Sequence, residues 1–322
     1  MTTYHQPVLL KNCIEGLNCK EDGIYVDVTF GGGGHSKAIL ASVGMKGKLI
    51  AFDQDRDAAV NAPIDKRFTL IPQNFRYLRN FIRDMKIKGV DGILADLGLS
   101  SHQLDQSERG FAFRHQTKLD MRMNQNAKKT AADVINLETP ENLIRIFRMY
   151  GEIENAGRLG HRLVEERGKR PIHYSAQLIE ICKELSSPKK ENQYLARVFQ
   201  ALRIEVNQEL DALKELLEQT LEILNPCGRL VIMSYHSLED RMVKNFMRTG
   251  NIAGSLEKDF YGNPLSPFIP LTKKPITPTE NEISENSRAR SAKLRIAEKK
   301  IEIQKEGTEE QTHQMRKKPY GE

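Results

Sequence analysis

Residues 24–36, with the sequence IYVDVTFGGGGHS, constrain the fold more than any other stretch of the chain. The pattern predicts a buried strand, a loop of four consecutive glycines and the first turn of a helix. Four glycines leave no side chain between the backbone and a ligand, and the first N–H groups of the following helix point toward the same place. We therefore expect a ligand-binding loop between this strand and this helix.

Asp27 narrows the choice of ligand, because it lies in the strand just before the glycines. A carboxylate there would repel the pyrophosphate of a dinucleotide such as NAD, whereas it would attract the ammonium or sulfonium group of S-adenosylmethionine. The residues thus favour S-adenosylmethionine, and an NAD-dependent oxidoreductase is the alternative from another class of enzyme.

Short apolar runs alternate with helical patterns along the first hundred residues and return after residue 227. Short buried strands separated by helices are typical of a parallel sheet covered on both faces, with right-handed crossovers between strands. The predicted fold class is therefore α/β, a doubly wound, Rossmann-like sheet. The predicted strands lie at 24–28, 48–53, 67–71, 90–96 and 228–235.

Two more carboxylates fall at the ends of these strands. Asp53 follows the glycines at about twenty residues, the spacing at which an acidic residue bonds ribose hydroxyls. Asp96 ends the fourth strand, where it could accept a ligand N–H, and Phe75 follows the third strand, where it could stack on adenine. Each acid alone could be a turn or cap residue, but three acids at one sheet edge indicate a binding site.

Between residue 101 and the strand at 228–235 lies far more chain than one crossover helix needs. We assign the last helix of this region to the sheet and the earlier ones to an inserted, all-helical domain. The predicted helices lie at 130–137, 140–150, 153–167, 175–185, 193–204 and 207–224. The predicted division is a sheet domain at 1–104 and 207–298, a helical insertion at 105–206 and a disordered tail at 299–322.

The net charge of +6 and a pI near 9.0 are compatible with a polyanionic partner without proving one. Four basic residues, Arg288, Arg290, Lys293 and Arg295, fall in a predicted edge strand at 287–297. They either line a path for phosphates or form a solvated face.

The four cysteines are scattered and no histidines have metal-ligand spacing, so we expect reduced thiols and no metal site. We find no signal-peptide pattern at the N-terminus and no apolar run long enough to span a membrane, which predicts a cytoplasmic protein.

His236 ends the strand at 228–235, beside the predicted site. Ser237, followed three residues later by Asp240, predicts a capping box that opens a helix, and this pattern leaves His236 unexplained. The pattern G-x-S-x-G does not occur, which argues against a serine hydrolase.

Seven short motifs, in order over residues 4 to about 298, resemble those of the bacterial ribosomal RNA small subunit methyltransferase H family, also called MraW. The resemblance implies a class I methyltransferase fold with an inserted helical domain. It also implies N4-methylation of one cytidine in the decoding region of 16S rRNA, within the 30S subunit, with S-adenosylmethionine as donor. The motifs are YHQPVLL at residue 4, TFGGGGHS at 29, DLGLSS at 96, ERGF at 108, LDMRM at 119, HSLEDR at 236 and RARS at 288.

The same resemblance implies which residues bind the donor. The aligned positions are Gly33, Gly34, His35, Asp53, Phe75, Asp96 and Gln103. Ser287 replaces a proline that is frequent in the family, and Ile153 replaces a common glutamate.

The catalytic assignment has less support in the motifs. Amino-methyltransferases generally place Asp/Asn/Ser-Pro-Pro-aromatic after the fourth strand, but this chain has DLGL from Asp96. We expect Asp96 to orient donor and amine, and we take Ser100, Asp120 and His236 as candidates for the proton acceptor. A DNA cytosine-N4 methyltransferase and a non-catalytic 30S assembly factor stay open as alternatives, as does a homodimer.

Overall fold

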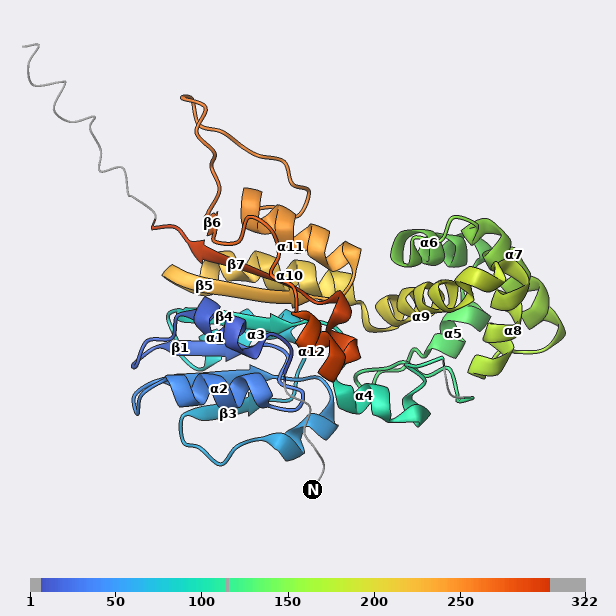
Figure 1. Cartoon of the computed structure of the whole chain (residues 1–322), viewed down its shortest axis with the longest axis horizontal. Coiled ribbons are helices and arrows are strands. Elements are labelled where there is room, and N and C mark those ends of the chain that lie inside the picture. The colour runs from blue at the N-terminus through green and yellow to red at the C-terminus, as the bar shows by residue number, and fades with distance from the viewer. Residues whose placement is uncertain (1–6, 114–115, 302–322) are drawn as a thin grey trace, which may run out of the picture.

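The computed structural model describes residues 7–113 and 116–301. A seven-stranded sheet with the order β3-β2-β1-β4-β5-β7-β6 lies at its centre (Figure 1). Strands β1 to β5 pair in parallel, whereas β7 runs antiparallel to both of its neighbours. The predicted α/β class with a doubly wound sheet is confirmed. The strands are β1 (Ile24–Asp27), β2 (Lys48–Phe52), β3 (Phe68–Ile71), β4 (Val90–Asp96), β5 (Leu224–Ser234), β6 (Phe268–Pro270) and β7 (Lys293–Lys299).

Helices cover both faces of the sheet. Successive side chains of a strand point to opposite faces, so apolar strands give the sheet two apolar faces that have to be covered. Val26 packs with α3, α10 and α11 on one face, and its neighbour Tyr25 packs with α1 and α2 on the other. The long helices on the sheet are α1 (Leu10–Leu17), α2 (Gly34–Ser42), α3 (Leu78–Asp84), α10 (Glu209–Ile223) and α11 (Ser237–Thr249). Two short helices, α4 (Ser101–Asp105) and α12 (Glu280–Glu285), lie near the carboxyl ends of the strands.

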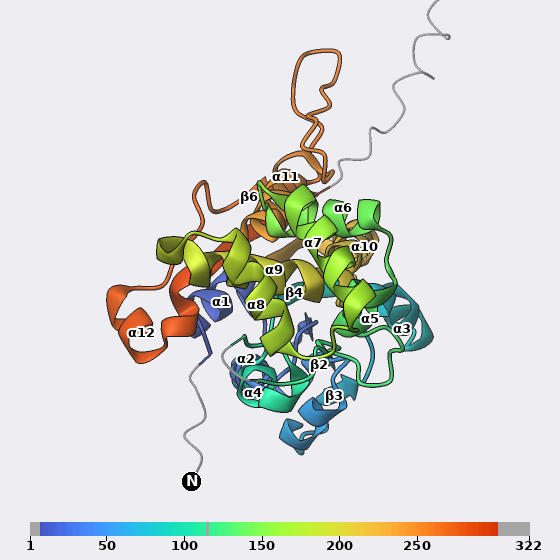
Figure 2. The ribbon, with the colours of Figure 1, turned by 90° about the vertical axis from the view of Figure 1, so that its right-hand side faces the viewer.

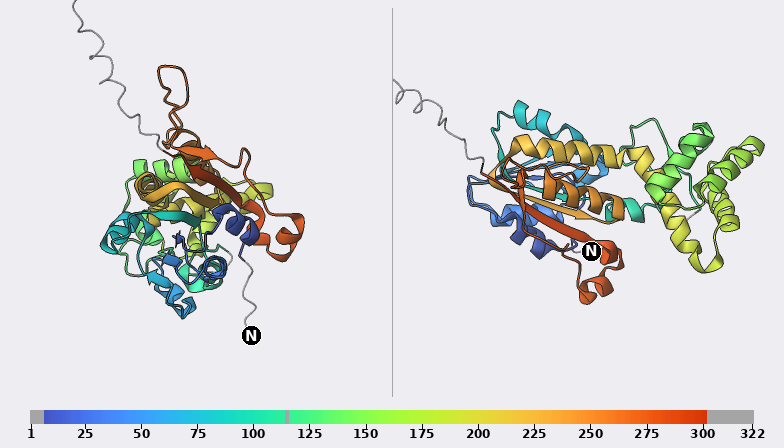
Figure 3. Two further views of the ribbon diagram at one scale, coloured as in Figure 1. Left: turned by 90° about the vertical axis from the view of Figure 1, so that its left-hand side faces the viewer. Right: turned by 90° about the horizontal axis from the view of Figure 1, so that it is seen from above.

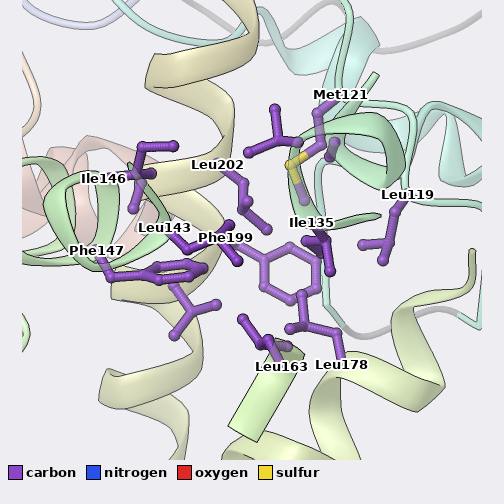
Figure 4. Close-up of a cluster of buried hydrophobic side chains, with 14 of the residues drawn as sticks. Leu119, Met121, Ile135, Leu143, Ile146, Phe147, Leu163, Leu178, Phe199 and Leu202 are labelled. Atoms are coloured by element: carbon purple, nitrogen blue, oxygen red, sulfur yellow. The ribbon is translucent and has the colours of Figure 1, made fainter. Parts of the chain in front are cut away.

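Five helices form a separate layer beyond that edge of the sheet (Figures 1 and 3). Their apolar faces meet in a core of their own, in which Leu143, Phe147 and Leu163 are fully buried and Phe199 is 4% exposed (Figure 4). We keep 105–206 as our proposal for the inserted domain, since the buried residues of this core lie between Phe111 and Val206, with Leu99 and Leu104 packed against it from the sheet side. These helices are α5 (Ala131–Leu137), α6 (Pro140–Gly151), α7 (Ala156–Lys169), α8 (Ser175–Leu185) and α9 (Glu191–Asn207).

Three of the predicted domain boundaries fall inside a helix or strand of the structure. Asn207 ends α9 instead of opening the next helix, because Gln208 takes the left-handed conformation (φ 51°) that separates α9 from α10. Residue 105 is the last residue of α4, so the proposed boundary between 104 and 105 falls inside this short helix. Lys299, predicted to open the tail, is the last residue of β7 and donates to the carbonyls of Leu221 and Leu224. The rest of the predicted tail, from residue 302, lies outside the described residues.

The basic stretch near the C-terminus also differs from its prediction. Residues Ser287–Ser291 form a short 3-10 helix, and only the following residues form β7. β7 is not an edge strand, because β6 pairs with its outer side. The predicted edge strand therefore exists only in its second half and lies inside the sheet.

A long hairpin-like loop between α11 and β6 extends away from the body of the molecule (Figures 1 and 2). Among the described segments, no helix has the length and apolar character needed to cross a bilayer.

Candidate active site

A cavity of about 380 Å³ opens at the carboxyl ends of β1, β2, β4 and β5. This is the edge where open α/β sheets bind ligands, at the point where the strand order reverses between β1 and β4. The lining contains seven of the residues selected from the sequence: Gly34, His35, Asp53, Phe75, Asp96, Ser100 and Gln103. Four others lie outside the lining: Asp27, Gly33, Asp120 and His236.

The glycine loop requires glycine for packing as well as for ligand access. Gly33 has a left-handed backbone (φ 75°), and a Cβ there would come within 2.9 Å of the Phe30 ring. A Cβ on Gly34 would lie 2.2 Å from Cγ of Pro7. Because α2 begins at Gly34, the loop also aims the first amides of this helix at the cavity.

Asp53 is fixed by two backbone amides at the end of β2. The amide of Gly31 donates to Oδ2 at 2.7 Å, and the amide of Asp55 donates to Oδ1 at 2.8 Å. Burial raises the pKa of Asp53 to about 6, although both amides act to lower it. Each carboxylate oxygen keeps acceptor capacity for a ligand hydroxyl, so this residue could hold a ribose.

Asp96 lies at the end of β4 between a tyrosine and a histidine. The hydroxyl of Tyr235 donates to Oδ1 at 2.8 Å, and Nδ1 of His35 lies 3.9 Å from Oδ2. Burial raises the pKa of Asp96 to about 6, while His35 and Tyr235 act to lower it. The carboxylate is thus a hydrogen-bond acceptor that titrates close to neutrality, which suits a general base.

Asp27 supports the loop from below instead of facing the cavity. Its Oδ2 accepts a hydrogen bond of 2.6 Å from the Ser36 hydroxyl, and its Oδ1 accepts one of 3.1 Å from the Thr29 amide. The residue is 1% exposed, and burial raises its pKa. Asp27 therefore ties β1 to α2, with its carboxyl group directly beneath the glycine loop.

Ser100 and Gln103 form a capping box at the start of α4. The Gln103 amide donates to Ser100 Oγ at 3.2 Å, and the Ser100 amide donates to Gln103 Oε1 at 3.1 Å. The Gln103 side-chain nitrogen donates to Asp55 Oδ2 at 2.8 Å. Both residues line the cavity, and both side chains stabilise the start of α4 through the capping box.

Arg109 fastens the irregular connection after α4 onto the β2 side of the cavity. Its guanidinium donates to Asp55 Oδ2 at 2.9 Å and to the carbonyls of Arg122 and Met123 at 2.8 and 3.0 Å. Only 9% of Arg109 is exposed. Arg109 therefore holds residues 122–123 of this connection against the cavity, which Met123 lines.

Phe75 opens the short 3-10 helix that follows β3, which Asn74 caps by accepting the Arg76 amide at 2.9 Å. It packs against the core of the sheet and faces the cavity with part of its ring. An aromatic ring at this position is available for an adenine.

The far wall of the cavity is an ionic cluster that the sequence analysis did not select. Arg203 of α9 donates to both oxygens of Glu209 of α10, at 2.8 and 2.9 Å. Glu239 of α11 accepts the Tyr235 amide at 3.0 Å and lies 3.1 Å from Nε2 of His236. Burial alone would raise the pKa of Glu239. The combined effect of its neighbours, chiefly His236 and Arg203, is larger and lowers this pKa below its ordinary value.

Ligand atoms of Glu209, His236 and Glu239 lie within 4.8 Å of one another, a grouping that could hold a metal ion. However, Arg203 occupies both oxygens of Glu209, and His236 lies against Glu239. The two carboxylates thus already have basic partners, and we assign no metal to them.

The two remaining catalytic candidates have structural surroundings. Asp120 binds the Arg122 guanidinium through both oxygens, at 2.8 and 2.6 Å, outside the cavity lining. His236 caps α11, since its Nδ1 accepts the Glu239 amide at 3.4 Å. The predicted capping box of Ser237 and Asp240 is wrong: the cap lies one residue earlier, and Asp240 pairs with Arg295 at 2.7 Å.

The C-terminal basic residues do not form a continuous path for phosphates. Arg295 is 6% exposed and is bound to Asp240, and Lys293 lies 3.6 Å from the same carboxylate. Arg288 lines the cavity mouth and pairs with Asp105 at 2.5 Å, whereas Arg290 is exposed.

Tyr235 could have been selected from the sequence, because it is the last residue before His236 at a strand end. Arg203, Glu209 and Glu239 carry no such signal, since helical periodicity gives the buried face of each helix but not which helices meet.

Comparison with known proteins identifies the family of this chain. The family model for the MraW methylase family matches residues 2–300. The chain belongs to the MraW methylase family. The ribosomal RNA small subunit methyltransferase H of Bacteroides fragilis (strain YCH46) is 55% identical over 299 residues, which cover 93% of this chain and 98% of that protein. The protein of the same name from Flavobacterium johnsoniae is 55% identical over 302 residues, which cover 93% of this chain and 100% of that protein.

A solved structure of a putative rRNA methylase from Clostridium thermocellum overlaps weakly, with 14% identity, a TM-score of 0.43 and coverage of 93% of this chain and all of that chain. Membership of the MraW methylase family rests on the sequence match and makes methyl transfer the class of reaction for the cavity.

Proposed function

We propose that this protein transfers a methyl group from S-adenosylmethionine to the N4 amino group of one cytidine in the decoding region of 16S rRNA. The relatives are called ribosomal RNA small subunit methyltransferase H, and the quoted motifs resemble that family over nearly the whole chain. The observation that carries the proposal is one cavity with the glycine loop and Asp53 at one end and the Asp96–Tyr235 pair beside it.

The donor fits the loop end of this cavity. Asp53 would accept the ribose hydroxyls and Phe75 would contact the adenine. Gly33, Gly34 and His35 would lie under the methionine part, with the carboxyl group of Asp27 beneath them. Gln103 would act through Asp55 and Ser100, which its side chain holds in place. The donor supplies an electrophilic methyl group on a sulfonium, and no phosphate has to sit over Asp27.

Methyl transfer to cytosine N4 is chiefly a positioning task, because the lone pair of this amine is delocalised into the ring. The nitrogen attacks the methyl carbon, the carbon–sulfur bond breaks and the sulfonium becomes a neutral thioether. The new N–C bond leaves one proton too many on the nitrogen. Asp96 would orient the amine through an N–H···O bond and accept this proton, a balance that needs no metal ion.

The other acceptor candidates have different standing in this proposal. Ser100 lines the cavity, but its hydroxyl oxygen already accepts the Gln103 amide as the cap of α4, so it is a weaker candidate for the proton acceptor. Asp120 and His236 would act on the shape of the site, through Arg122 and Glu239 respectively.

The target nucleotide has to leave any stack to reach this cavity. Binding to the small ribosomal subunit should weaken with salt, since backbone contacts dominate RNA binding by shape. A cytoplasmic location is part of this proposal, because assembled or assembling 30S particles are the substrate.

The test is to incubate the purified protein with labelled S-adenosylmethionine and 30S particles that lack the modification, then to identify methylated nucleosides by mass spectrometry. N4-methylcytidine in 16S rRNA is expected, and protein-free 16S rRNA and duplex DNA are parallel substrates. Methylation of DNA alone would favour a DNA cytosine-N4 methyltransferase. Binding of 30S without transfer would favour an assembly factor, and either result would contradict the proposal.

A further inference from the structure

Helix α11 carries three cations on one side. Arg241, Lys244 and Arg248 are spaced by three and four residues, so their side chains follow one face of the helix. All three are exposed. In the described ranges 7–113 and 116–301 no ion pair involves them, and Asp240, the nearest acid in sequence, pairs instead with Lys293 and Arg295.

A groove of about 410 Å³ runs between α6 and α11 and adjoins this face. Arg148 and Tyr150 line it from α6, and Arg241 and Asn245 line it from α11. Figure 2 shows the two helices as neighbours below the long loop. One carboxylate, that of Glu152, faces the groove, where it accepts the Ser237 hydroxyl at 2.7 Å.

The loop beyond α11 ends in two exposed aromatic rings. Phe260 is 97% exposed and Tyr261 is 82% exposed, and the ring centroids lie 5.5 Å apart. The tip is built around Asp259, whose Oδ1 accepts the amides of Tyr261 and Asn263 at 2.9 and 2.8 Å. Because the backbone of the tip is hydrogen-bonded, the rings are presented to solvent by a defined turn, as expected for a contact surface.

We call these six residues together, Arg148, Arg241, Lys244, Arg248, Phe260 and Tyr261, the α11 track. We propose that the α11 track binds the RNA strand that flanks the target nucleotide, with phosphates on the cations and a base stacked on the aromatic tip. This inference rests on the proposed function and adds where the substrate lies outside the cavity.

The position of α11 favours this path. The helix begins directly after His236, and Glu239 in its first turn lines the cavity. Its 13 residues span about 20 Å, so a strand leaving the cavity can follow the cationic face to Gly250, where the loop that carries the aromatic tip begins. The predicted platform on the C-terminal strand is less suitable, because Arg295 there is buried and bound to Asp240.

The chemistry of the track favours RNA over a protein partner. Several cations on one helix face without acidic partners suit the phosphates of a nucleic-acid backbone. Aromatic rings that stack on bases are typical of surfaces for unpaired RNA.

The experiment measures binding of the full chain to protein-free 16S rRNA and to 30S particles at several salt concentrations. One variant carries Arg241→Gln, Lys244→Gln and Arg248→Gln, and another carries Phe260→Ala and Tyr261→Ala. The matched control carries Lys46→Gln, Lys48→Gln and Lys88→Gln, three exposed lysines near the opposite edge of the sheet, where β2 and β4 begin. Donor affinity, measured by calorimetry, should stay unchanged in all of them.

For the cation variant we expect the slope of log K against log salt to shrink by about 2, since each phosphate contact with a single strand contributes about 0.7. For the tip variant we expect an affinity loss of roughly ten-fold at constant slope. The control should match the wild type.

Wild-type affinity and slope in both α11 variants would overturn the inference. So would a loss confined to 30S particles with normal binding to protein-free rRNA, since that would indicate a ribosomal protein as the partner. Because the readout is binding, these results are independent of whether the wild type transfers a methyl group, which tests the proposed function.

Discussion

The two ends of the cavity are built in different ways. At the donor end, the loop after β1 and the end of β2 place Gly34 and Asp53 through local backbone geometry, with two amides fixing the carboxylate. At the far end, the Arg203–Glu209 ion pair joins α9 to α10, and Glu239 of α11 lies near enough for Arg203 to lower its pKa. The donor end is therefore a property of the sheet, and the far end depends on how the helical insertion meets the sheet.

This difference predicts separable effects of substitution. Changes at the donor end should alter donor binding and chemistry while the fold persists. Changes at the far end should first alter stability, because they leave charges unpaired at a junction.

The largest expected effect is on Asp96, at the boundary between the two ends. Asp96→Asn keeps an acceptor for the Tyr235 hydroxyl but removes the proton acceptor, so kcat should fall by about 10²–10⁴-fold, a larger loss than any change in donor affinity. The measurement is single-turnover transfer to 30S particles together with donor calorimetry.

Stability provides the internal control for this variant. Burial raises the folded pKa of Asp96 to about 6, above its ordinary value of 3.8. The folded state therefore binds more protons than the unfolded state between these values, and the residue's contribution to stability is lost as pH rises through about 6. Asp96→Asn should thus be at least as stable as the wild type at pH 8. A clear loss of stability there would attribute the lost activity to misfolding.

The next effect tests the far end. Arg203→Met removes the partner of Glu209 and leaves a largely buried carboxylate uncompensated, which should lower the free energy of unfolding by about 3 kcal/mol. Urea unfolding measures this loss. The matched control is Arg79→Met, whose partner Glu222 is 60% exposed, so that loss should stay below about 1 kcal/mol. Equal losses of unfolding free energy in both variants would show that the Arg203–Glu209 pair contributes no more to stability than an exposed ion pair.

The comparison also explains how much could be predicted from sequence. Asp53, Asp96 and the glycines occupy strand ends and a strand–helix loop, and the rule that parallel sheets bind ligands at carboxyl edges brings them together. The fold class followed from the same alternation of strands and helices. Asp27 also lies at the carboxyl end of a parallel strand. Its side chain, however, lies beneath α2 and accepts a hydrogen bond from Ser36, because adjacent strand residues face opposite sides of the sheet.

Residues placed by tertiary contacts could not be predicted in this way. The junction of α9 and α10 depends on Gln208, which has a left-handed backbone. No sequence pattern predicts this conformation at a glutamine. The C-terminal basic stretch resembled an exposed strand, but β6 adds outside it and Arg295 finds Asp240. Whether a charge is solvated or buried depended on a partner more than fifty residues away.

A smaller effect is expected at Tyr235, which joins the two ends. Tyr235→Phe removes the hydrogen bond that lowers the pKa of Asp96, so this pKa should rise above about 6. If Asp96 must be ionised, the acidic limb of kcat/KM should move to higher pH by about one unit, with near-normal rates at pH 8.5. A uniform loss at every pH would instead assign Tyr235 to binding of the target base.

The smallest expected effect separates a cap from a catalyst at Ser100. If its hydroxyl mainly caps α4, Ser100→Ala should lower the free energy of unfolding by about 1 kcal/mol and change kcat by less than ten-fold. Thr130→Ala is the matched control, because Thr130 forms the same capping box with Asp133 at α5, in the helical insertion. Ser100→Asp should recover stability, since aspartate caps helices without a hydroxyl. Should Ser100→Ala and Ser100→Asp both lose more than 10²-fold in kcat while the Thr130 variant keeps full activity, Ser100 would replace Asp96 as the proton acceptor.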